Sequence, residues 1–242
     1  MRSTIVVTTA VIVAGCHGEK TGTIAGPPLT VAPSTPPPVA PPSAAFQQLT
    51  AAGVDLALTA CQAVVVTPVT GTAAFANERL APGDVMAVRG LPEHGARLTG
   101  QGLAVVAMVH DADCVTRSRV VRATRAPELV FMGGAMNAHL DVDDREIAPF
   151  YLGRLSGTAG VPEHSHDSSW EILCAVEAAG RFTLDGKESA LGARTCVAIP
   201  PGVKHSWRPD AGSNLVAVQM YAPPGPEQRF KKFAAEEAVR DR

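Results

Sequence analysis

The sequence has almost no net charge and lacks any long apolar run. Its 21 lysine and arginine side chains nearly balance 23 aspartate and glutamate side chains, which leaves a formal net charge of −2. That balance excludes a dedicated nucleic-acid-binding protein, because such a protein needs a basic face. No stretch of about 18 uncharged apolar residues occurs, so we expect no membrane-spanning helix in the body of the protein. The 22 glycines and 20 prolines follow no collagen-like period, and 46% hydrophobic residues suffice for a folded core.

One short apolar segment lies at the N-terminus. Arg2 precedes an uncharged stretch from Thr4 to Gly15, an arrangement typical of a secretory signal peptide. The residues Val-Ala-Gly-Cys at 13–16 resemble the lipobox of bacterial lipoproteins, in which the cysteine is acylated and becomes the new N-terminus. This resemblance implies a signal peptide over 1–15 and a membrane anchor at Cys16. A plain cleaved signal with a chance cysteine is the alternative.

A proline-rich segment follows, from residue 16 to 44. Eight of the 20 prolines lie between Gly26 and Pro42, a composition that favours an extended spacer over a helix or a central strand. It suits a stalk between a lipid anchor and a folded domain, and an ordinary disordered tail has the same composition. The lipoprotein resemblance implies an exported protein on the cell membrane or outer membrane, facing the periplasm or exterior. Because His17 rather than Asp follows the cysteine, it implies the outer membrane in a cell with two membranes.

Short β-rich runs separated by Gly, Pro, Asp and Asn make up residues 45–222. Their spacing of roughly ten residues predicts an all-β sandwich or barrel, and Asp185-Gly186 is a strong signal for a two-residue hairpin turn. Helical periodicity is found over 227–240, where two phenylalanines lie on one face of a charged segment. We expect a short C-terminal helix there that caps or brackets the barrel.

Two stretches of the sequence resemble each other about 110 residues apart, which indicates an internal repeat. Residues 80–94 and 191–205 both begin with leucine and end with histidine, and 102–108 matches 214–220. We interpret them as two copies of one β-barrel unit; similar composition of Val- and Ala-rich strands is the alternative explanation. The expected barrels span 45–140 and 141–242.

Four cysteines remain beyond the N-terminal segment: Cys61, Cys114, Cys174 and Cys196. Four cysteines of an exported protein can pair in three ways. We favour a bridge within each half, or none.

Three histidines and one glutamate in the second half have the spacing of a metal site. His164 and His166 are two residues apart, so on a strand both imidazoles leave the same face. Glu171 follows a polar turn that lets a neighbouring strand present its carboxylate to the same point. His205 comes after a Pro-Pro-Gly turn that would direct a later strand end inward. Three imidazoles and a carboxylate suit one divalent transition metal, Fe, Mn, Ni, Cu or Zn.

These residues resemble the cupin superfamily. Its first motif, His-x-His and a following Glu, corresponds to His164, His166 and Glu171, and its second motif, Pro-x-Gly-x-x-His, ends at His205. Two turn glycines of the family are displaced, with Ala178 in one of the usual places, but the ligands are intact. The resemblance implies two tandem double-stranded β-helix, or jelly-roll, barrels.

The first half has no matching ligand set. His94 is its counterpart of His205, but no histidine lies between His17 and His94. We therefore expect a degenerate first barrel that serves packing, and one metal-binding barrel.

Residues that could contact a ligand are less sharply marked than the metal ligands. Strand alternation places Gln219 and Tyr221 on one face and Met220 on the other. Arg154 is a candidate because a guanidinium recognises a carboxylate or phosphate with two hydrogen bonds; a surface salt bridge is the alternative.

Three functions compete on this evidence. A metal-dependent enzyme, dioxygenase-like or otherwise an isomerase or lyase, is what the cupin resemblance implies, since no Ser/His/Asp arrangement is evident. A metal-dependent module that binds or senses a small sugar or carboxylate without turnover is the second, and an inert storage-type barrel the third. The expected partners are a small molecule and, through Cys16, a membrane, and the chain is expected to be a monomer or homodimer.

Overall fold

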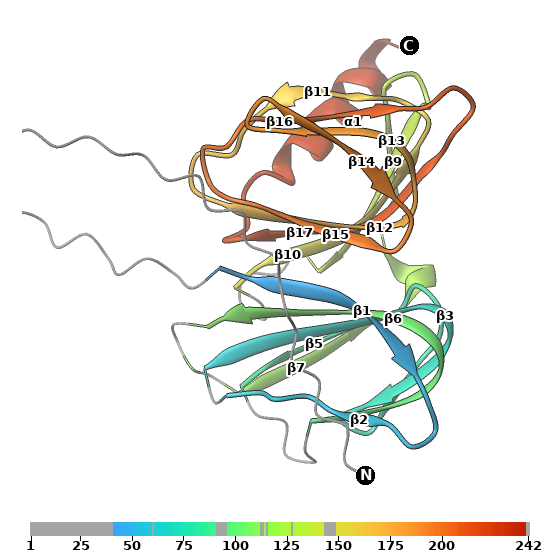
Figure 1. The fold of residues 1–242 in the computed structure, drawn as a ribbon, viewed down its shortest axis with the longest axis vertical. Coiled ribbons are helices and arrows are strands. Elements are labelled where there is room, and N and C mark those ends of the chain that lie inside the picture. Colours follow the sequence, from blue (N-terminus) through green and yellow to red (C-terminus); the bar gives the residue numbers. More distant parts are fainter. Residues whose placement is uncertain are drawn as a thin grey trace, which may run out of the picture.

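Two stacked β-barrels and a C-terminal helix form the described part of the protein (Figure 1). This computed structural model describes residues 41–59, 61–90, 96–111, 114, 116–126, 128–142 and 149–240. It confirms the expected all-β class with tandem cupin-type barrels and a short C-terminal helix. The expected signal peptide, Cys16 and His94 lie outside the described residues, as does the proline-rich segment up to residue 40.

The first barrel is one strongly bent antiparallel sheet. Its strands are β1 (Ser43–Leu49), β2 (Val54–Asp55), β3 (Gln62–Phe75), β4 (Glu78–Leu80), β5 (Val85–Arg89), β6 (Arg97–His110) and β7 (Arg117–Val121). The order is β1-β6-β3-β5-β7, with β2 paired to β6 and β4 to β3. Strands β3 and β6 pair along most of their 14 residues each, and a register shift between Pro68 and Thr70 lets them bend together.

The second barrel consists of two sheets. Its strands are β8 (Glu128–Phe131), β9 (Met136–Val142), β10 (Tyr151–Gly157), β11 (Val161–His164), β12 (Trp170–Glu177), β13 (Ala179–Leu184), β14 (Lys187–Gly192), β15 (Thr195–Ile199), β16 (His205–Pro209) and β17 (Leu215–Ala222). One sheet has the order β15-β12-β17-β10-β9-β8, and the other has the order β11-β16-β13-β14. The predicted hairpin turn at Asp185-Gly186 joins β13 to β14.

The boundary between the barrels differs from the one expected at 140/141. That position falls inside β9, which pairs with β10 in the sheet of the second barrel. β7 belongs to the sheet of the first barrel and β8 to a sheet of the second, and the 3-10 helix η1 (Ala123–Arg125) lies between these two strands. Because β9 pairs with β10 and β8 pairs with β9, both strands belong to the second barrel.

Both barrels share one pairing scheme. In the first, β6 lies between β1 and β3, and β3 also pairs with β5; in the second, β17 lies between β10 and β12, and β12 also pairs with β15. The correspondence agrees with the interpretation of the sequence as two related units.

Central strands are buried on both faces, which explains their near-continuous apolar sequences. On β3, Val64 and Val66 belong to the interior of the first barrel, whereas Ala63 and Val65 face the second barrel. The inter-barrel core comprises residues of both barrels: Ala63, Val65, Val85, Ala87, Val105, Ala107, Val109, Phe150, Leu152, Ile172, Cys174, Val218, Met220 and Ala222. Fully burying one larger apolar side chain contributes roughly 1.5–3 kcal/mol, so this core holds the barrels together.

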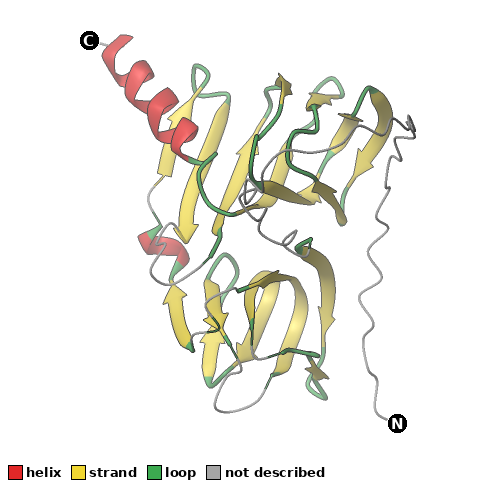
Figure 2. Cartoon of the chain, turned by 90° about the vertical axis from the view of Figure 1, so that its left-hand side faces the viewer, coloured by secondary structure: helices red, strands yellow, loops and turns green. Residues whose placement is uncertain are grey.

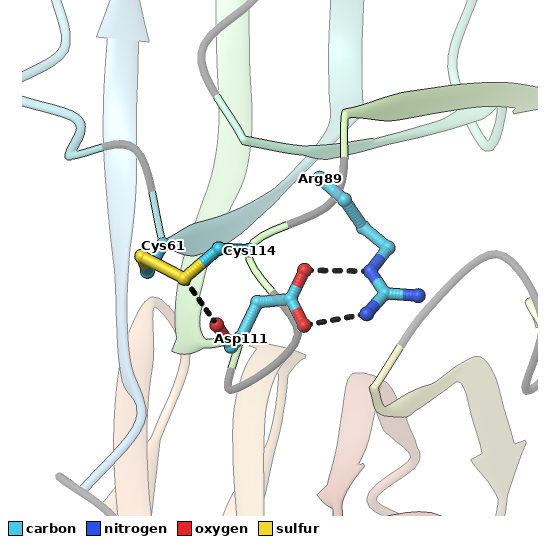
Figure 3. Close-up of a disulfide and its surroundings, with 4 residues drawn as sticks. All are labelled: Cys61, Arg89, Asp111 and Cys114. Atoms are coloured by element: carbon cyan, nitrogen blue, oxygen red, sulfur yellow. Dashed lines mark hydrogen bonds and ion pairs between the residues drawn. A yellow bond between two sulfur atoms is a disulfide. The ribbon is translucent and has the colours of Figure 1, made fainter.

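Each barrel contains one disulfide, which confirms the first of the two expected alternatives, a bridge within each half. Cys61 is joined to Cys114 in the first barrel, and Cys174 is joined to Cys196 across the neighbouring strands β12 and β15. Beside the first bridge, Asp111 accepts two hydrogen bonds from Arg89, at 2.6 Å from Nε and 2.5 Å from Nη2 (Figure 3). Both side chains are buried, so the pair and the disulfide together fix this end of the first barrel.

Helix α1 (Gln228–Arg240) lies against the second barrel and away from the first (Figure 2). Phe230 stacks on Phe131 of β8 with ring centroids 5.5 Å apart, and Phe233 lies 6.1 Å from the same ring. The predicted apolar stripe therefore packs on the barrel as expected. No helix in the described ranges is long and apolar enough to cross a membrane.

Candidate metal centre

The four predicted ligands meet where the two sheets of the second barrel adjoin. His164 ends β11 and is the direct pairing partner of His205, which begins β16. His166 lies in the loop after β11, not on the strand, and its backbone carbonyl accepts a 2.8 Å hydrogen bond from the Gly202 amide. Gly202 has a φ of +76°, a conformation that favours glycine. The Pro-Pro-Gly turn thus holds the His166 loop next to His205.

Glu171, near the start of β12, lies at the centre of the cluster. Its Oε2 is 2.8 Å from Nε2 of His166 and 3.0 Å from Nε2 of His205. One potential ligand atom from each of His164, His166, Glu171 and His205 lies within 4.8 Å of the others. Ligand atoms about 2.1 Å from a shared ion would lie roughly 3–4 Å apart, so small side-chain shifts suffice.

Two histidines have ring orientations fixed by the backbone. Nδ1 of His164 is 2.8 Å from the carbonyl oxygen of Pro162, and Nδ1 of His205 is 3.0 Å from that of Val203. Each Nδ1 must donate its proton to the carbonyl, which leaves Nε2 of the neutral ring with a lone pair. That lone pair of His205 faces the carboxylate of Glu171, an arrangement that needs a cation between them. A metal ion fits this donor set and this orientation.

Hydrogen bonds keep the Glu171 carboxylate ionised. Burial alone would raise its pKa, but hydrogen bonds from His166, from the protonated form of His205 and from Gln219 outweigh burial and lower the pKa from 4.5 to about 2. Gln219 donates from Nε2 to Oε1 of Glu171 at 2.7 Å. Because an ionised carboxylate only accepts, this contact fixes which end of the Gln219 amide faces Glu171.

The pKa values of two histidines shift in opposite directions. Burial lowers the pKa of His164. For His205, burial also acts to lower the pKa, but the hydrogen bond to Glu171 outweighs it and the pKa is raised. The position between His205 and Glu171 therefore attracts a cation, either a proton or a metal ion.

A cavity of about 230 Å³ opens beside the cluster, on the side covered by α1. Its lining includes Glu171, Gln219 and Tyr221, and most of the other lining side chains are apolar. Burial, chiefly, raises the pKa of Tyr221 well above 10, so this phenol stays protonated. Two of the three predicted ligand-contacting residues, Gln219 and Tyr221, thus line the cavity.

The third predicted residue, Arg154, is not among the residues that line this cavity. On β10, Leu155 faces the cavity, so Arg154 leaves the opposite face. Its guanidinium lies beside Gly83 of the first barrel, where an added Cβ would be 2.6 Å from Nη1.

Arg229 is a lining residue that the sequence reasoning missed. It lies in the first turn of α1, and its Nη2 contacts Nδ1 of His166 and lies 3.5 Å from Nε2 of the same ring. A signal was present, because only five residues separate the end of β17 at Ala222 from α1, which keeps the first helical turn at the barrel mouth.

Comparisons with known proteins agree with this fold. Residues 154–220 match the family model described as a cupin domain. A glyoxylate-induced protein from Pseudomonas aeruginosa is similar in structure, with a TM-score of 0.56 and 11% identity over 75% of this chain and 74% of that one. Oxalate decarboxylase from Bacillus subtilis gives a TM-score of 0.50 and 9% identity over 67% of this chain and 63% of that one. No curated protein matches the sequence.

Residues 154–220 in the second barrel therefore match a cupin domain, and the fold of the described residues is that of tandem cupin-type barrels. The cluster of three histidines and one glutamate fits a metal-binding cupin.

Proposed function

We propose that the protein is a metal-dependent enzyme, dioxygenase-like in its chemistry, that acts on a small molecule in the second barrel. The observation that carries this proposal is the orientation of the buried ligand set beside a mostly apolar cavity. A bound divalent transition metal would supply Lewis acidity and, for a redox-active ion, the capacity to react with oxygen.

The residues of this chain would hold the ion and keep bulk water away from the reacting molecule. Backbone carbonyls orient His164 and His205, and Gln219 orients Glu171. Tyr221, which packs edge-on against His166 at 5.0 Å between ring centroids, keeps its proton and offers a phenol to the cavity. Apolar lining excludes water, which strengthens each polar contact inside the cavity.

The test is the metal content of the purified protein, measured by elemental mass spectrometry beside His164→Ala/His166→Ala. His110→Ala is the matched control, since His110 is exposed at the end of β6. We expect one transition-metal ion per chain in the wild type and the control, and its loss in the double variant. Equal metal content in all three proteins, or none in any of them after incubation with each candidate metal, would refute the assignment.

A binding or sensing module without turnover is the second candidate. Among the described lining residues, the carboxylate outside the metal cluster is Glu163, which pairs with Lys204 at 3.2 Å. The cavity thus offers no separate carboxylate base, which favours binding alone. Oxygen consumption or product formation that depends on the metal supports the enzyme; tight ligand binding with neither supports the module.

We also propose that the protein is exported and anchored by acylation of Cys16. The lipobox-like residues 13–16 support this, and so do the two disulfides, because disulfides persist in oxidising compartments. Labelled palmitate should be incorporated into the wild type and not into Cys16→Ala. Incorporation into both proteins, or into neither, would contradict the proposal.

We further propose a monomer. The inter-barrel core already buries the sheet faces that a single barrel would have to cover by pairing with a second copy. Light scattering coupled to size exclusion should give the mass of one chain, and the mass of two would indicate a homodimer.

A further inference from the structure

The guanidinium of Arg229 is placed against the metal-ligand cluster. Its Nη2 contacts the ring of His166, and Arg229 lines the same cavity as His205 and Tyr221. Arg229 itself is half-buried at the cavity. The proposed function puts a divalent cation beside this permanent positive charge, and the two cations repel each other.

The nearby negative charges do not balance such a pair of cations. Glu171 belongs to the cluster, and Glu227 is buried at the start of α1, where it accepts hydrogen bonds from the Gly225 amide and the Gln228 side chain. Glu163 at the cavity is neutralised by Lys204. A divalent ion and Arg229 together exceed Glu171 and Glu227 by one positive charge. Two neighbouring cations with an excess charge favour an anion that contacts both.

The contact between Arg229 and His166 also depends on the metal. In the arrangement described here, Nδ1 of His166 accepts from Arg229, and Nε2 is free to donate to Glu171. If Nε2 binds a metal, the proton of the neutral ring must lie on Nδ1, which can no longer accept. The Arg229 donors are then released for another acceptor in the cavity.

Apolar side chains form most of the remaining wall. Phe131, Phe230 and Phe233 make one aromatic side of the cavity, between β8 and α1. Its volume of about 230 Å³ is below the roughly 300–1,000 Å³ typical of drug-sized pockets. Two polar atoms of lining residues, Oε1 of Gln219 and Nε1 of Trp207, have no hydrogen-bond partner among the described residues. The polar anchors are therefore few, and a sugar would leave most of its hydroxyl groups without partners.

We propose that this cavity binds a small organic monoanion, a carboxylate with an aromatic or alkyl body, whose charge lies between Arg229 and the metal centre. The proposal rests on the proposed metal-dependent function and names the ligand class of that site. Arg229 recognises the carboxylate, and the phenylalanines of β8 and α1 hold the apolar body.

Isothermal titration calorimetry on the full-length, metal-loaded protein tests this. The probes are benzoate, phenylacetate and hexanoate, each beside its neutral amide, with galactose as a polar comparison. We expect at least one carboxylate to bind roughly 10- to 100-fold more tightly than its amide, as a charged hydrogen bond lost in a buried site predicts. Arg229→Gln should lose that preference, Arg229→Lys should retain part of it, and Lys232→Gln, at an exposed position of α1, should behave as wild type.

Two results separate the inference from the function on which it rests. In the first result, Arg229→Gln and wild type both bind the metal, but wild type binds carboxylates and amides equally. That result would overturn the ligand class and leave the metal function intact. The same holds if Arg229→Gln binds carboxylates as tightly as wild type, or if galactose binds best. Failure of the wild-type protein to hold a metal overturns the proposed function itself.

Discussion

Replacing Gln219 by leucine should weaken metal binding without removing a metal ligand. Gln219 donates to Glu171 at 2.7 Å, and the residue is 6% exposed. A hydrogen bond to a buried charged group contributes about 1.5–3 kcal/mol, and loss of a residue that orients a metal ligand costs about 10- to 100-fold in metal affinity. We expect an affinity loss in that range, measured by competition with a chromophoric chelator.

The same substitution has a second consequence that a purely steric effect would not produce. Because the Gln219 hydrogen bond helps lower the pKa of Glu171 to about 2, its loss should move that pKa upward in the metal-free protein. Carbon NMR of the Glu171 carboxylate measures this shift directly. Gln101→Leu, at an exposed position of β6, is the matched control. Unchanged metal affinity and an unchanged Glu171 pKa in Gln219→Leu would refute the reasoning.

Three further predictions concern the charges of both barrels. Asp111→Ala should lower the free energy of unfolding by about 3–5 kcal/mol, because it removes the carboxylate that pairs with the buried charge of Arg89. Chemical denaturation measures this loss, and a value under about 1 kcal/mol would contradict the prediction. The lowered pKa of Glu171 stabilises the metal-free fold above pH 4.5, and this contribution should disappear as the pH falls towards about 2. The free energy of unfolding of Glu171→Gln should therefore fall less steeply with pH than that of wild type. Parallel pH dependences of the two proteins would refute the assignment. Metal binding should release a proton from His205, because Glu171 raises the pKa of this histidine in the metal-free protein. Calorimetry near pH 6.5 in buffers of different ionisation enthalpy should detect this proton release, and the number of protons released should fall towards pH 8.

The metal ligands could be predicted from the sequence because their geometry is encoded locally. His164, His166 and Glu171 lie within eight residues, and His205 follows a turn whose glycine has the required positive φ. Even there, the strand argument was wrong in one detail, since His166 lies in the loop beyond β11. Its position depends on the hydrogen bond from Gly202, a contact that strand periodicity does not describe.

Features that depend on distant pairing could not be predicted in the same way. The expected boundary at 140/141 was wrong because β9 pairs with β10, and no periodicity within β9 specifies that partner. Arg154 was a candidate because of its guanidinium, and alternation could not exclude it, because both faces of β10 carry buried residues. The structure puts Leu155, not Arg154, on the cavity side. The contact between Arg229 and His166 spans 63 residues, so it depends on how the helix docks.

The two barrels share a pairing scheme but fill their interiors differently, and this difference explains their separate roles. Bulky apolar side chains such as Phe75, Met86 and Leu98 fill the interior of the first barrel, whereas polar ligands and a cavity occupy the second. The outer face of the first barrel covers the apolar face formed by Ile172 of β12, Met220 of β17 and their neighbours. Removing that cover would expose the back of the strands that carry Glu171 and Gln219. The first barrel therefore supports the site from behind, because it buries the strands that position the ligands.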